Sequence, residues 1–441
     1  MNIEEVLILL DNWVREKKRE GLTPVQKEIL RRAWDDQTYD DMEIYPYSNE
    51  SIKKMLAPKL WKLLSEVLGQ PVTKKTLRIV VEAAVEERSP SPPPQLPIAK
   101  APQRQDWGDA PDIFTFYDRT SELTTLDGWI VTQRCRLVAL WGVAGIGKTA
   151  LAVKLAQQLQ GKFEFVIWRS LRYAPPVEDI LADLLEFFSE EAETILPDTF
   201  ANRVSLLMEC LRSHRCLIIL DGVETILEAS QLAGKAPENY RNYGRLFKQI
   251  GESKHASCLV LTSCEKFREI SLLEGQDRPV RYYKLKGLKK DAAKEILRER
   301  GLVEEPEWSS LIDRYEGNPL YLNIVAAMIR ELFAGRASEY LRKNTIFIGG
   351  IEDILDPQFD KLAKVEREVV YQLAIAPNSL SFDQLQERII SQISTSKFIE
   401  TVKSLEERSL IEKLIENGQA MFTLQAVVRK YILSRCDSTS N

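Results

Sequence analysis

The residues best suited to chemistry lie between positions 137 and 151, in the sequence LVALWGVAGIGKTAL. This segment contains the pattern G-x-x-x-x-G-K-T after an apolar run and before a helical pattern. Glycine permits backbone conformations that are closed to residues with a Cβ, so successive N–H groups can surround phosphate oxygens. A lysine then supplies positive charge, and a threonine hydroxyl supplies a magnesium ligand. The segment therefore predicts a site for a nucleoside triphosphate and Mg²⁺.

The loop and the start of the following helix provide the expected phosphate contacts: Gly142, Val143, Ala144, Gly145, Ile146, Gly147, Lys148, Thr149 and Ala150. We expect Lys148 to reach the β- and γ-phosphates and Thr149 to bind the metal. The alternative interpretation is a glycine-rich turn that only joins a strand to a helix. The apolar run at 137–140 and the spacing of Leu151, Leu155 and Leu159 satisfy the strand and helix context that the motif requires.

A second candidate group follows the apolar run CLIIL, in the sequence LDGVE. Asp221 ends this expected strand in a Walker B arrangement, where a carboxylate holds magnesium together with Thr149. Glu224 is the candidate to orient or deprotonate an attacking water. The alternatives are that Asp221 caps a helix and that Glu224 is an acid of its first turn.

A third group is LTSCEK, in which Thr262 and Ser263 carry hydroxyl groups suited to sensing a γ-phosphate. Cys264 stands where a cationic side chain is expected, and a thiol cannot neutralise phosphate charge. Arg268 follows one helical turn later and is a candidate replacement, although a lone loop arginine is usually only solvated.

The composition limits the remaining classes of function. The chain has 441 residues and a formal net charge of -5, so it has no overall basic field for nucleic acid. Its two histidines argue against a histidine zinc site or catalytic triad, and six cysteines without a C-x-x-C pair indicate reduced thiols. There is no signal peptide pattern and no run of about 20 apolar residues. We therefore expect a soluble cytoplasmic protein without a membrane partner.

The pattern along the chain predicts a multidomain protein with α and α/β parts. A helical segment at 1–88 precedes a proline-rich linker at 89–111. Strand signals alternate with helical stretches at 137–140, 165–170, 216–220, 257–262 and 280–285. This alternation predicts a doubly wound parallel sheet in a nucleotide-binding domain at 112–287. A helical subdomain is expected at 288–347, a winged-helix domain with a strand at 421–424 is expected at 348–436, and a tail is expected at 437–441.

These motifs resemble those of NB-ARC domains, the STAND class of signalling ATPases. The phosphate loop, LDGVE, LTSCEK and Gly317-Asn318-Pro319-Leu320 occur in the order of that family, and the resemblance spans 114–433. It implies that Pro319 packs on the adenine, although Pro319 also suits a helix start. It implies that Phe116 and Arg119, in FYDRTSEL, meet the base. Gln425, in FTLQAVVRKY, takes the place of a histidine that contacts the β-phosphate of ADP, or is a plain surface residue.

The resemblance implies a switch in signal transduction that is closed with ADP and open with ATP, because a ligand shifts conformations through differential affinity. The second Walker B acid is replaced by Gly222, which indicates slow ATP hydrolysis. No repeat array follows the last expected domain, so we expect a protein partner to carry the sensor, or the small domains to sense directly. Nucleotide-dependent oligomers are also expected. A metabolic kinase is disfavoured because no substrate site is evident.

The N-terminal module has a helix-turn-helix pattern: LTPVQKEILRRAW is an amphipathic helix, TYDDMEIYPYS is a short helix and turn, and NESIKKMLAPKLWKLLSEVLG is a longer helix. It resembles the N-terminal domain of vWA-MoxR associated proteins. Ser48 or Asn49 is expected to cap the last helix, whose inner face is Leu60, Trp61, Leu64 and Leu68.

Positive charge is concentrated on that last helix and its flank. Residues 48–78 contain seven Lys or Arg and two Glu, a local balance of +5. This favours contact with DNA or with a protein partner through Asn49, Lys53, Lys54, Lys59 and Lys62. Pro58 lies inside the helix and is expected to kink or divide it. DNA binding, as in an ATP-regulated transcription regulator, and protein binding both stay open.

Overall fold

A computed structural model describes residues 3–18, 21–34, 37–78, 80–81, 84, 104–189, 197–228, 231–389 and 393–439. The chain forms two compact units, 1–100 and 101–441, each with its own hydrophobic core. Among the described residues, none of the helices combines the length and the apolar character needed to cross a bilayer.

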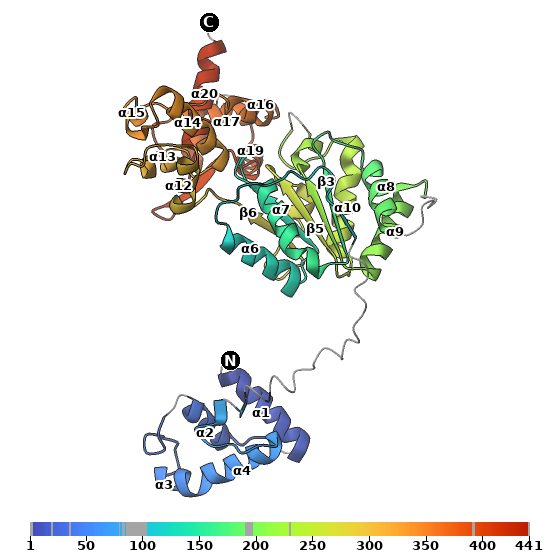
Figure 1. Cartoon of the computed structure of the whole chain (residues 1–441), viewed down its shortest axis with the longest axis vertical. Helices are drawn as coiled ribbons and strands as arrows, with labels where there is room; N and C mark the ends of the chain where they lie inside the picture. Colours follow the sequence, from blue (N-terminus) through green and yellow to red (C-terminus); the bar gives the residue numbers. More distant parts are fainter. Residues whose placement is uncertain are drawn as a thin grey trace. The chain divides into compact units, whose positions relative to one another are not determined.

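The first unit is a small helical domain (Figure 1). Its helices are α1 (Ile3–Lys18), α2 (Pro24–Trp34), α3 (Asn49–Ser51), the π-helical segment η1 (Ile52–Leu56) and α4 (Ala57–Leu68). Ser48 caps α3 by accepting a hydrogen bond from the N–H of Ser51. The four apolar residues expected on the inner face of the last helix are all buried: Leu60, Trp61, Leu64 and Leu68. The two longer helices of the sequence prediction are therefore confirmed.

The expected short helix at 38–48 is wrong. The chain forms turns there, with a β-bridge between Ile44 and Tyr47. Pro46 explains the difference, because proline lacks an N–H and disfavours helical backbone at the residue before it. Pro58 has a milder effect. It lies at the start of α4, and the turn before it widens into η1 because proline cannot donate the regular helical hydrogen bond.

The second unit is built on a parallel six-stranded sheet (Figure 1). In sequence order its strands are β1 (Arg104–Asp106), β2 (Leu137–Trp141), β3 (Phe165–Ser170), β4 (Cys216–Asp221), β5 (Cys258–Ser263) and β6 (Val280–Lys284). Their order in space is β1-β3-β4-β5-β2-β6, which places the strand of the phosphate loop between β5 and β6. The five strands predicted from sequence are confirmed. Strand β1 was not predicted, and it lies within the range expected to be linker.

Successive residues of β2 enter different cores, as the alternation of a pleated strand requires. Val138 and Leu140 pack with α6 (Thr120–Asp127) and α7 (Lys148–Leu159), while Leu137 and Ala139 face the other side. That second side is covered by α8 (Val177–Phe188), α9 (Phe200–Ser213) and α10 (Arg241–Glu252) (Figure 1). The short segments around them are η2 (Gly128–Thr132), η3 (Gln160–Lys162), η4 (Val223–Ile226), η5 (Glu238–Tyr240) and α11 (Arg268–Ser271).

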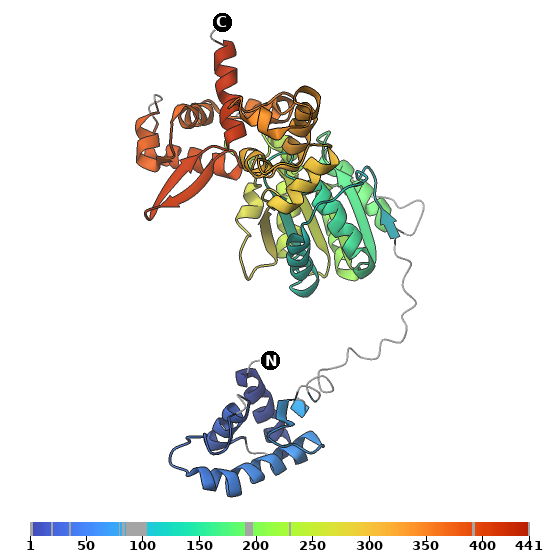
Figure 2. The same ribbon diagram turned by 60° about the vertical axis from the view of Figure 1, so that its left-hand side comes forward.

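The rest of the second unit is mainly helical, as expected from Leu288 onward. Its helices are α12 (Lys290–Glu299), α13 (Trp308–Arg314), α14 (Pro319–Leu332), α15 (Ala337–Leu341), α16 (Glu352–Asp360), α17 (Lys364–Ile375), α18 (Phe382–Glu387), α19 (Thr395–Glu407) and α20 (Ala426–Thr439). A three-stranded sheet of β7 (Leu380–Ser381), β8 (Glu412–Glu416) and β9 (Gln419–Thr423) lies among them, in the order β7-β9-β8. Figure 2 shows the β8–β9 hairpin extending from this lobe, with the expected turn at Asn417 and Gly418.

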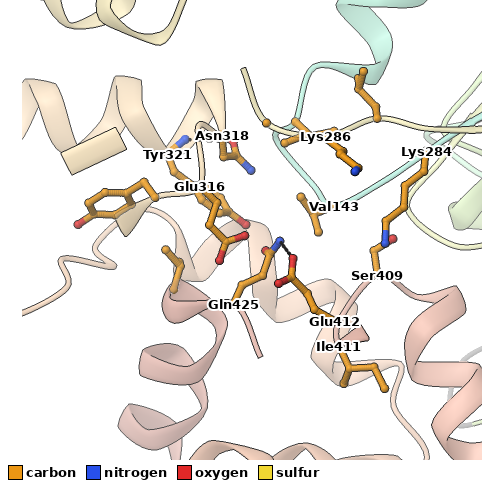
Figure 3. Close-up of a pocket in the computed structure, with 15 residues that line it drawn as sticks. Val143, Lys284, Lys286, Glu316, Asn318, Tyr321, Ser409, Ile411, Glu412 and Gln425 are labelled. Carbon is orange, nitrogen blue, oxygen red and sulfur yellow. Dashed lines mark hydrogen bonds between the residues drawn. The ribbon is translucent and has the colours of Figure 1, made fainter. Parts of the chain in front are cut away.

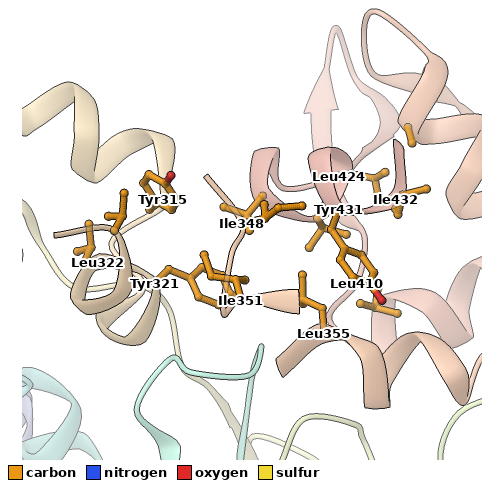
Figure 4. Close-up of a cluster of buried hydrophobic side chains, with 14 of the residues drawn as sticks. Tyr315, Tyr321, Leu322, Ile348, Ile351, Leu355, Leu410, Leu424, Tyr431 and Ile432 are labelled. Carbon is orange, nitrogen blue, oxygen red and sulfur yellow. The ribbon is translucent and has the colours of Figure 1, made fainter. Parts of the chain in front are cut away.

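A single hydrophobic core joins α12–α15 to α16–α20. Figure 4 shows where they meet: Tyr321 and Leu322 of α14 lie on one side, and Leu355 of α16 and Tyr431 of α20 lie on the other. The two helical stretches therefore pack as one lobe, which we call the C-terminal lobe (290–439).

Candidate functional site

The loop between β2 and α7 needs its glycines for backbone geometry and for space. Gly147 has φ +100° and is the N-cap of α7. Gly145 has φ +76°, and a Cβ there would lie 2.8 Å from the Cβ of Leu320. Both torsions fall in the region that side chains with a Cβ rarely adopt. The loop therefore presents its backbone to the N-terminus of α7, the arrangement that binds phosphate in nucleotide sites.

Lys148 lies inside this loop and is 7% exposed. Its Nζ donates to the carbonyl oxygens of Gly142 at 2.9 Å and Val143 at 3.0 Å, and it lies 3.1 Å from the Sγ of Cys264. Burial raises the pKa of the Cys264 thiol to about 12, so Cys264 is a neutral neighbour of the ammonium group. Lys148 thus carries its positive charge at the place where the motif predicts phosphates.

Three polar side chains converge beside the loop at the ends of β4 and β5 and the start of α7. Thr149 donates its hydroxyl to Oδ1 of Asp221 at 2.8 Å, and Thr262 donates to the same oxygen at 2.6 Å. The Thr262 hydroxyl also accepts the N–H of Gly222 at 2.9 Å. Burial raises the pKa of Asp221, while the two hydroxyl hydrogen bonds lower it. A carboxylate next to a threonine hydroxyl is the oxygen donor set that Mg²⁺ takes in phosphate sites.

Glu224 lies on the other side of Cys264 and is half-buried. Its Oε2 accepts the N–H of Cys264 at 3.2 Å, and its backbone oxygen accepts a hydrogen bond from Nζ of Lys361. The sequence analysis did not single out Lys361, which comes from the C-terminal lobe and is separated from Glu224 by 137 positions.

The phosphate loop, Thr149, Asp221, Thr262 and Glu224 line one cavity of about 440 Å³. Its lining includes the apolar residues Pro111, Ile113 and Leu320 and the acidic residues Asp221 and Glu224. It also includes loop and helix residues: Ala144, Gly145, Gly147, Lys148, Thr149 and Ala150. The cavity therefore brings apolar surface, a glycine loop and carboxylates together, as a site for a base, its phosphates and a metal ion requires. Arg172, exposed on the loop after β3, also lines this cavity and was missed from sequence.

Arg119 is hydrogen-bonded to the backbone of the phosphate loop. It is 5% exposed and donates to the carbonyl oxygens of Ile146 at 3.1 Å and Lys286 at 2.7 Å. Phe116 packs against the core that contains α7. Neither residue is among those that line the cavity, and their contact with the base stays a prediction.

Two further expected residues lie away from the cavity. The Ser263 hydroxyl accepts the N–H of Glu265 at 3.1 Å and closes a turn after β5. Arg268 is exposed and lines a different cavity, together with Lys235 and Arg245. Arg268 therefore does not replace the cation that is missing at Cys264, because α11 carries it away from the phosphate loop.

Helix α14 begins directly on the loop. The Oδ1 of Asn318 accepts the N–H groups of Leu320 at 3.1 Å and Tyr321 at 3.3 Å, and its Nδ2 donates to the carbonyl oxygen of Ala144 at 3.0 Å. Pro319 is at the first helical position, as its alternative interpretation required, and its neighbours Asn318 and Leu320 contact the loop.

Gln425 lies in a second cavity, of about 300 Å³, which Val143 and Ile146 also line (Figure 3). Its Nε2 donates to Glu412 at 3.2 Å, and its side chain is also hydrogen-bonded to Glu316. Burial, followed by the charge of Glu412, raises the pKa of Glu316 to about 7. Gln425 therefore lies in a cavity shared with the phosphate loop and is hydrogen-bonded to Glu412, and its contact with a β-phosphate stays a prediction.

The expected contact residues of the first unit differ in their surroundings. Asn49 donates to the backbone oxygen of Asp40, Lys53 pairs with the Asp40 carboxylate, and Lys54 pairs with Glu50. Lys59 and Lys62 are exposed on α4. Part of the local positive charge is therefore balanced by neighbouring acids.

The fold and the site together define a P-loop ATPase: a parallel sheet with the glycine loop on an inner strand and a carboxylate on the next strand but one. Comparison with family models agrees. Residues 136–301 match the NACHT domain, and residues 1–84 match the vWA-MoxR associated protein N-terminal HTH. Residues 136–301 are therefore similar to a NACHT domain of P-loop ATPases, and residues 1–84 are similar to that N-terminal helix-turn-helix module. The resemblance to STAND ATPases stated from sequence is confirmed.

Individual relatives agree with this assignment. An uncharacterized WD repeat-containing protein of Nostoc sp. is 43% identical over 340 residues, which are 74% of this chain and 27% of that protein. The disease resistance protein RPM1 of Arabidopsis thaliana is 25% identical over 200 residues, which are 44% of this chain and 21% of that protein. The chain thus spans about a quarter of the length of these relatives. A Walker-type ATPase of Pyrococcus abyssi shares the fold, with a TM-score of 0.51 and 15% identity over 72% of this chain and 96% of that chain.

Proposed function

We propose that this protein is a STAND-type molecular switch that binds ATP or ADP with Mg²⁺ and changes the arrangement of its lobes with the nucleotide. The observation that carries the proposal is the cluster of Thr149, Asp221 and Thr262 beside the phosphate loop, in a cavity that also reaches Leu320 of the C-terminal lobe. Nucleotide in that cavity contacts both parts of the second unit, so its identity can bias how they pack.

The proposed domains are a nucleotide-binding domain at 104–287, which begins earlier than the 112 expected from sequence because β1 belongs to its sheet, a helical subdomain at 288–347 and a winged-helix domain at 348–436. The winged-helix assignment is supported by the order α17, β7, α18, α19, β8 and β9, in which a helical group precedes a β-hairpin. The common core of α12–α20 implies that the last two domains move together.

The residues of the cavity have separate roles in the proposed site. Backbone N–H groups of the loop and Lys148 hold the phosphates, and Thr149 with Asp221 holds Mg²⁺, which supplies neutralising charge when bound. Glu224 is the proposed acceptor for a proton of water. Its Oε2 is engaged by the Cys264 N–H, and Gly222 stands where a second acid is common, so we propose slow hydrolysis that resets the switch.

Contacts between the sheet domain and the C-terminal lobe support a closed state. Nε1 of Trp141 donates to the backbone oxygen of Glu407 at 2.9 Å, and the N–H of Lys266 donates to the same oxygen at 3.0 Å. Asn318 adds its bond to Ala144. We propose that ADP is compatible with these contacts and that ATP weakens them.

The test is to identify the nucleotide that copurifies with the protein and to measure the oligomeric state with ADP and with a non-hydrolysable ATP analogue. We expect retained ADP in a monomer, assembly with the analogue, and loss of both on Lys148→Ala. Lys154→Ala, on the same helix but outside the cavity, is the matched control. The proposal fails if the wild-type protein retains no nucleotide and binds none at millimolar concentration.

A second candidate function is an ATP-regulated DNA-binding regulator that uses the first unit. It is supported by the match of 1–84 to a helix-turn-helix family and by the exposed Lys59 and Lys62 on one helix. A mobility shift with duplex DNA across a salt series tests it, with Lys59→Glu/Lys62→Glu against Lys290→Glu/Lys294→Glu on α12. Binding that ignores salt or ignores Lys59 and Lys62 rejects DNA contact through α4.

A further inference from the structure

The candidate nucleotide site lacks a cation at the position where Cys264 follows β5. Of the described residues that line the 440 Å³ cavity, only Lys148 and Arg172 are cationic. Lys148 belongs to the loop itself, and Arg172 lies on the loop after β3, near Gly222. Neither residue connects the γ-phosphate of ATP to the C-terminal lobe, which a nucleotide-driven switch requires.

A cationic side chain of the C-terminal lobe lines a neighbouring cavity. This cavity, of about 420 Å³, shares Ala144, Glu224, Thr225 and Cys264 with the nucleotide cavity. Its other lining residues include Lys361 of the C-terminal lobe, the C-cap residue that follows α16. The two cavities are therefore lined in part by the same residues of the sheet domain.

A chain of contacts leads from the phosphate loop to Lys361. Nζ of Lys148 lies 3.1 Å from Sγ of Cys264, and the Cys264 N–H donates to the Glu224 carboxylate at 3.2 Å. The backbone oxygen of Glu224 then accepts a hydrogen bond from Lys361. Along this chain of contacts only Cys264 and Glu224 separate Lys361 from Lys148, the residue that is expected to reach the γ-phosphate.

Charges of both signs act on Lys361: those of Glu265 and Glu224 are negative, and that of Arg408 is positive. The Lys361 side chain is half-buried, and desolvation lowers the pKa of its ammonium, while the charges of Glu265 and Glu224 raise it. Arg408, which lines the same cavity, is already held by the carboxylates of Glu265 and Glu366. Of these two cations, Arg408 has two carboxylate partners, whereas the described hydrogen bond of Lys361 is to the backbone oxygen of Glu224.

We propose that Lys361 discriminates ATP from ADP. Its ammonium donates a hydrogen bond to the γ-phosphate when ATP is bound, and this change of partner alters the arrangement of the C-terminal lobe. This rests on the proposed nucleotide switch and names the residue through which that site acts. Lys361 is a positioning residue for the lobe in the ADP state, held by Glu224, and gains a charged acceptor with ATP. A hydrogen bond to a charged acceptor is stronger than one to a neutral carbonyl, so ATP favours the altered arrangement.

The test measures the dissociation constants of ADP and of a non-hydrolysable ATP analogue, both with Mg²⁺, for the full chain and its variants. For Lys361→Met we expect roughly tenfold or greater weakening of the analogue, the scale of one charge-assisted hydrogen bond, and about twofold or less change for ADP. Lys361→Arg is expected to recover most of the analogue affinity. Lys364→Met, exposed three positions later, is the matched control.

The outcomes separate this inference from the proposed switch. If the wild-type protein binds neither nucleotide, the switch itself fails. If the wild-type protein binds both and Lys361→Met changes neither affinity, or changes both equally, only the role of Lys361 is overturned. Arg172→Gln is measured alongside. A selective loss of the analogue there, with Lys361→Met unaffected, would assign the γ-phosphate to Arg172 and reject Lys361. Thermal unfolding of Lys361→Arg and Lys361→Met verifies that each variant is folded.

Discussion

At the scale of single residues, Asp221 is the group on which the proposed metal site depends. Its Oδ1 accepts two hydroxyl hydrogen bonds, from Thr149 and Thr262, which fix the carboxylate beside the loop. We expect Asp221→Asn to keep both bonds, because an amide oxygen also accepts, and to lose the negative charge that attracts Mg²⁺. Nucleotide affinity measured in EDTA is then unchanged, and the gain in affinity on adding Mg²⁺ falls about tenfold, near the free energy of one charge-assisted interaction.

The control for this prediction is Asp291→Asn, an exposed carboxylate on α12. It removes the same charge far from the loop and is expected to leave the Mg²⁺ dependence intact. An equal loss in both variants would mean that overall charge, and not the Asp221 site, sets the metal dependence.

Glu316 makes a prediction about pH. Its pKa is raised to about 7 by burial and by Glu412, whereas an unfolded glutamate titrates near 4.5. Between these values the folded chain holds a proton that the unfolded chain has released, so the contribution of Glu316 to stability falls as pH rises from 4.5 to 7 and is constant above. The full change is about 3 kcal/mol. Urea titrations between pH 5 and 8 are expected to show Glu316→Gln gaining stability over the wild type as pH rises.

Glu331→Gln, exposed on α14, is the comparison for that experiment. Its difference from the wild type is expected to be flat across the same pH range. A flat difference for Glu316→Gln as well would show that the carboxylate of Glu316 is not held in its neutral form by the cavity.

At the scale of elements, the start of α14 links helix formation to the loop. Asn318 caps the helix through Oδ1 and binds Ala144 through Nδ2. We expect Asn318→Asp to keep the cap and lose the link, since a carboxylate cannot donate to a carbonyl, and Asn318→Ala to lose both. Asn318→Ala should cost about 1–2 kcal/mol in urea unfolding, and both variants should bind nucleotide more weakly. Ser394→Ala, which removes the cap of α19 away from the loop, should lower stability alone.

Elements were predictable where burial leaves a clear pattern. The inner strands β2, β4 and β5 are nearly continuous apolar runs, as in a parallel sheet covered on both faces, and were found within a residue or two. Strand β3 and the edge strand β6 were also found, and both contain aromatic residues typical of strands. The edge strand β1 has the polar sequence Arg-Gln-Asp and pairs only with β3, and it carries no such signal. The segment 38–48 was expected to be a short helix and turn, and only the turn is present, because Pro46 disfavours helical backbone at the residue before it.

Some residues of the candidate site could likewise be predicted from sequence, and others could not. Asp221 and Thr262 could be placed beside the loop because the carboxyl ends of neighbouring parallel strands share one edge of the sheet. Lys361 could not be placed there from sequence, because no local sequence pattern predicts which residue of the C-terminal lobe contacts that edge of the sheet. Gln425 was assigned by its position in a motif, whereas its contacts are set by Glu316 and Glu412, which come from two other elements.

At the scale of the whole second unit, one buried ion network joins the sheet domain to the C-terminal lobe. Arg408 is 4% exposed and bonds Glu265 of the sheet domain at 2.7 Å and Glu366 of the lobe at 3.3 Å. It also donates to the backbone oxygen of Gln231 at 2.7 Å. Glu265 and Glu366 are 4% and 0% exposed, so bulk water cannot replace Arg408 as their hydrogen-bond partner in this arrangement. A change in lobe arrangement therefore has to exchange or hydrate this network.

Replacing Arg408 should therefore destabilise the closed arrangement more than replacing an arginine whose ion pairs are exposed to water. We expect Arg408→Met to cost about 3–5 kcal/mol in unfolding, the scale for breaking a buried pair, and to increase the radius of gyration measured with ADP. In Arg408→Met the buried carboxylates of Glu265 and Glu366 have lost their cationic partner. Adding Glu265→Gln and Glu366→Gln removes these two unpaired charges, so the triple variant should recover much of that stability. Arg435→Met, whose pairs with Asp356 and Asp360 are half-exposed, should cost at most about 1 kcal/mol. Equal losses for Arg408→Met and Arg435→Met would show that the network does not hold the lobes together, because a buried and a hydrated pair would then have the same effect.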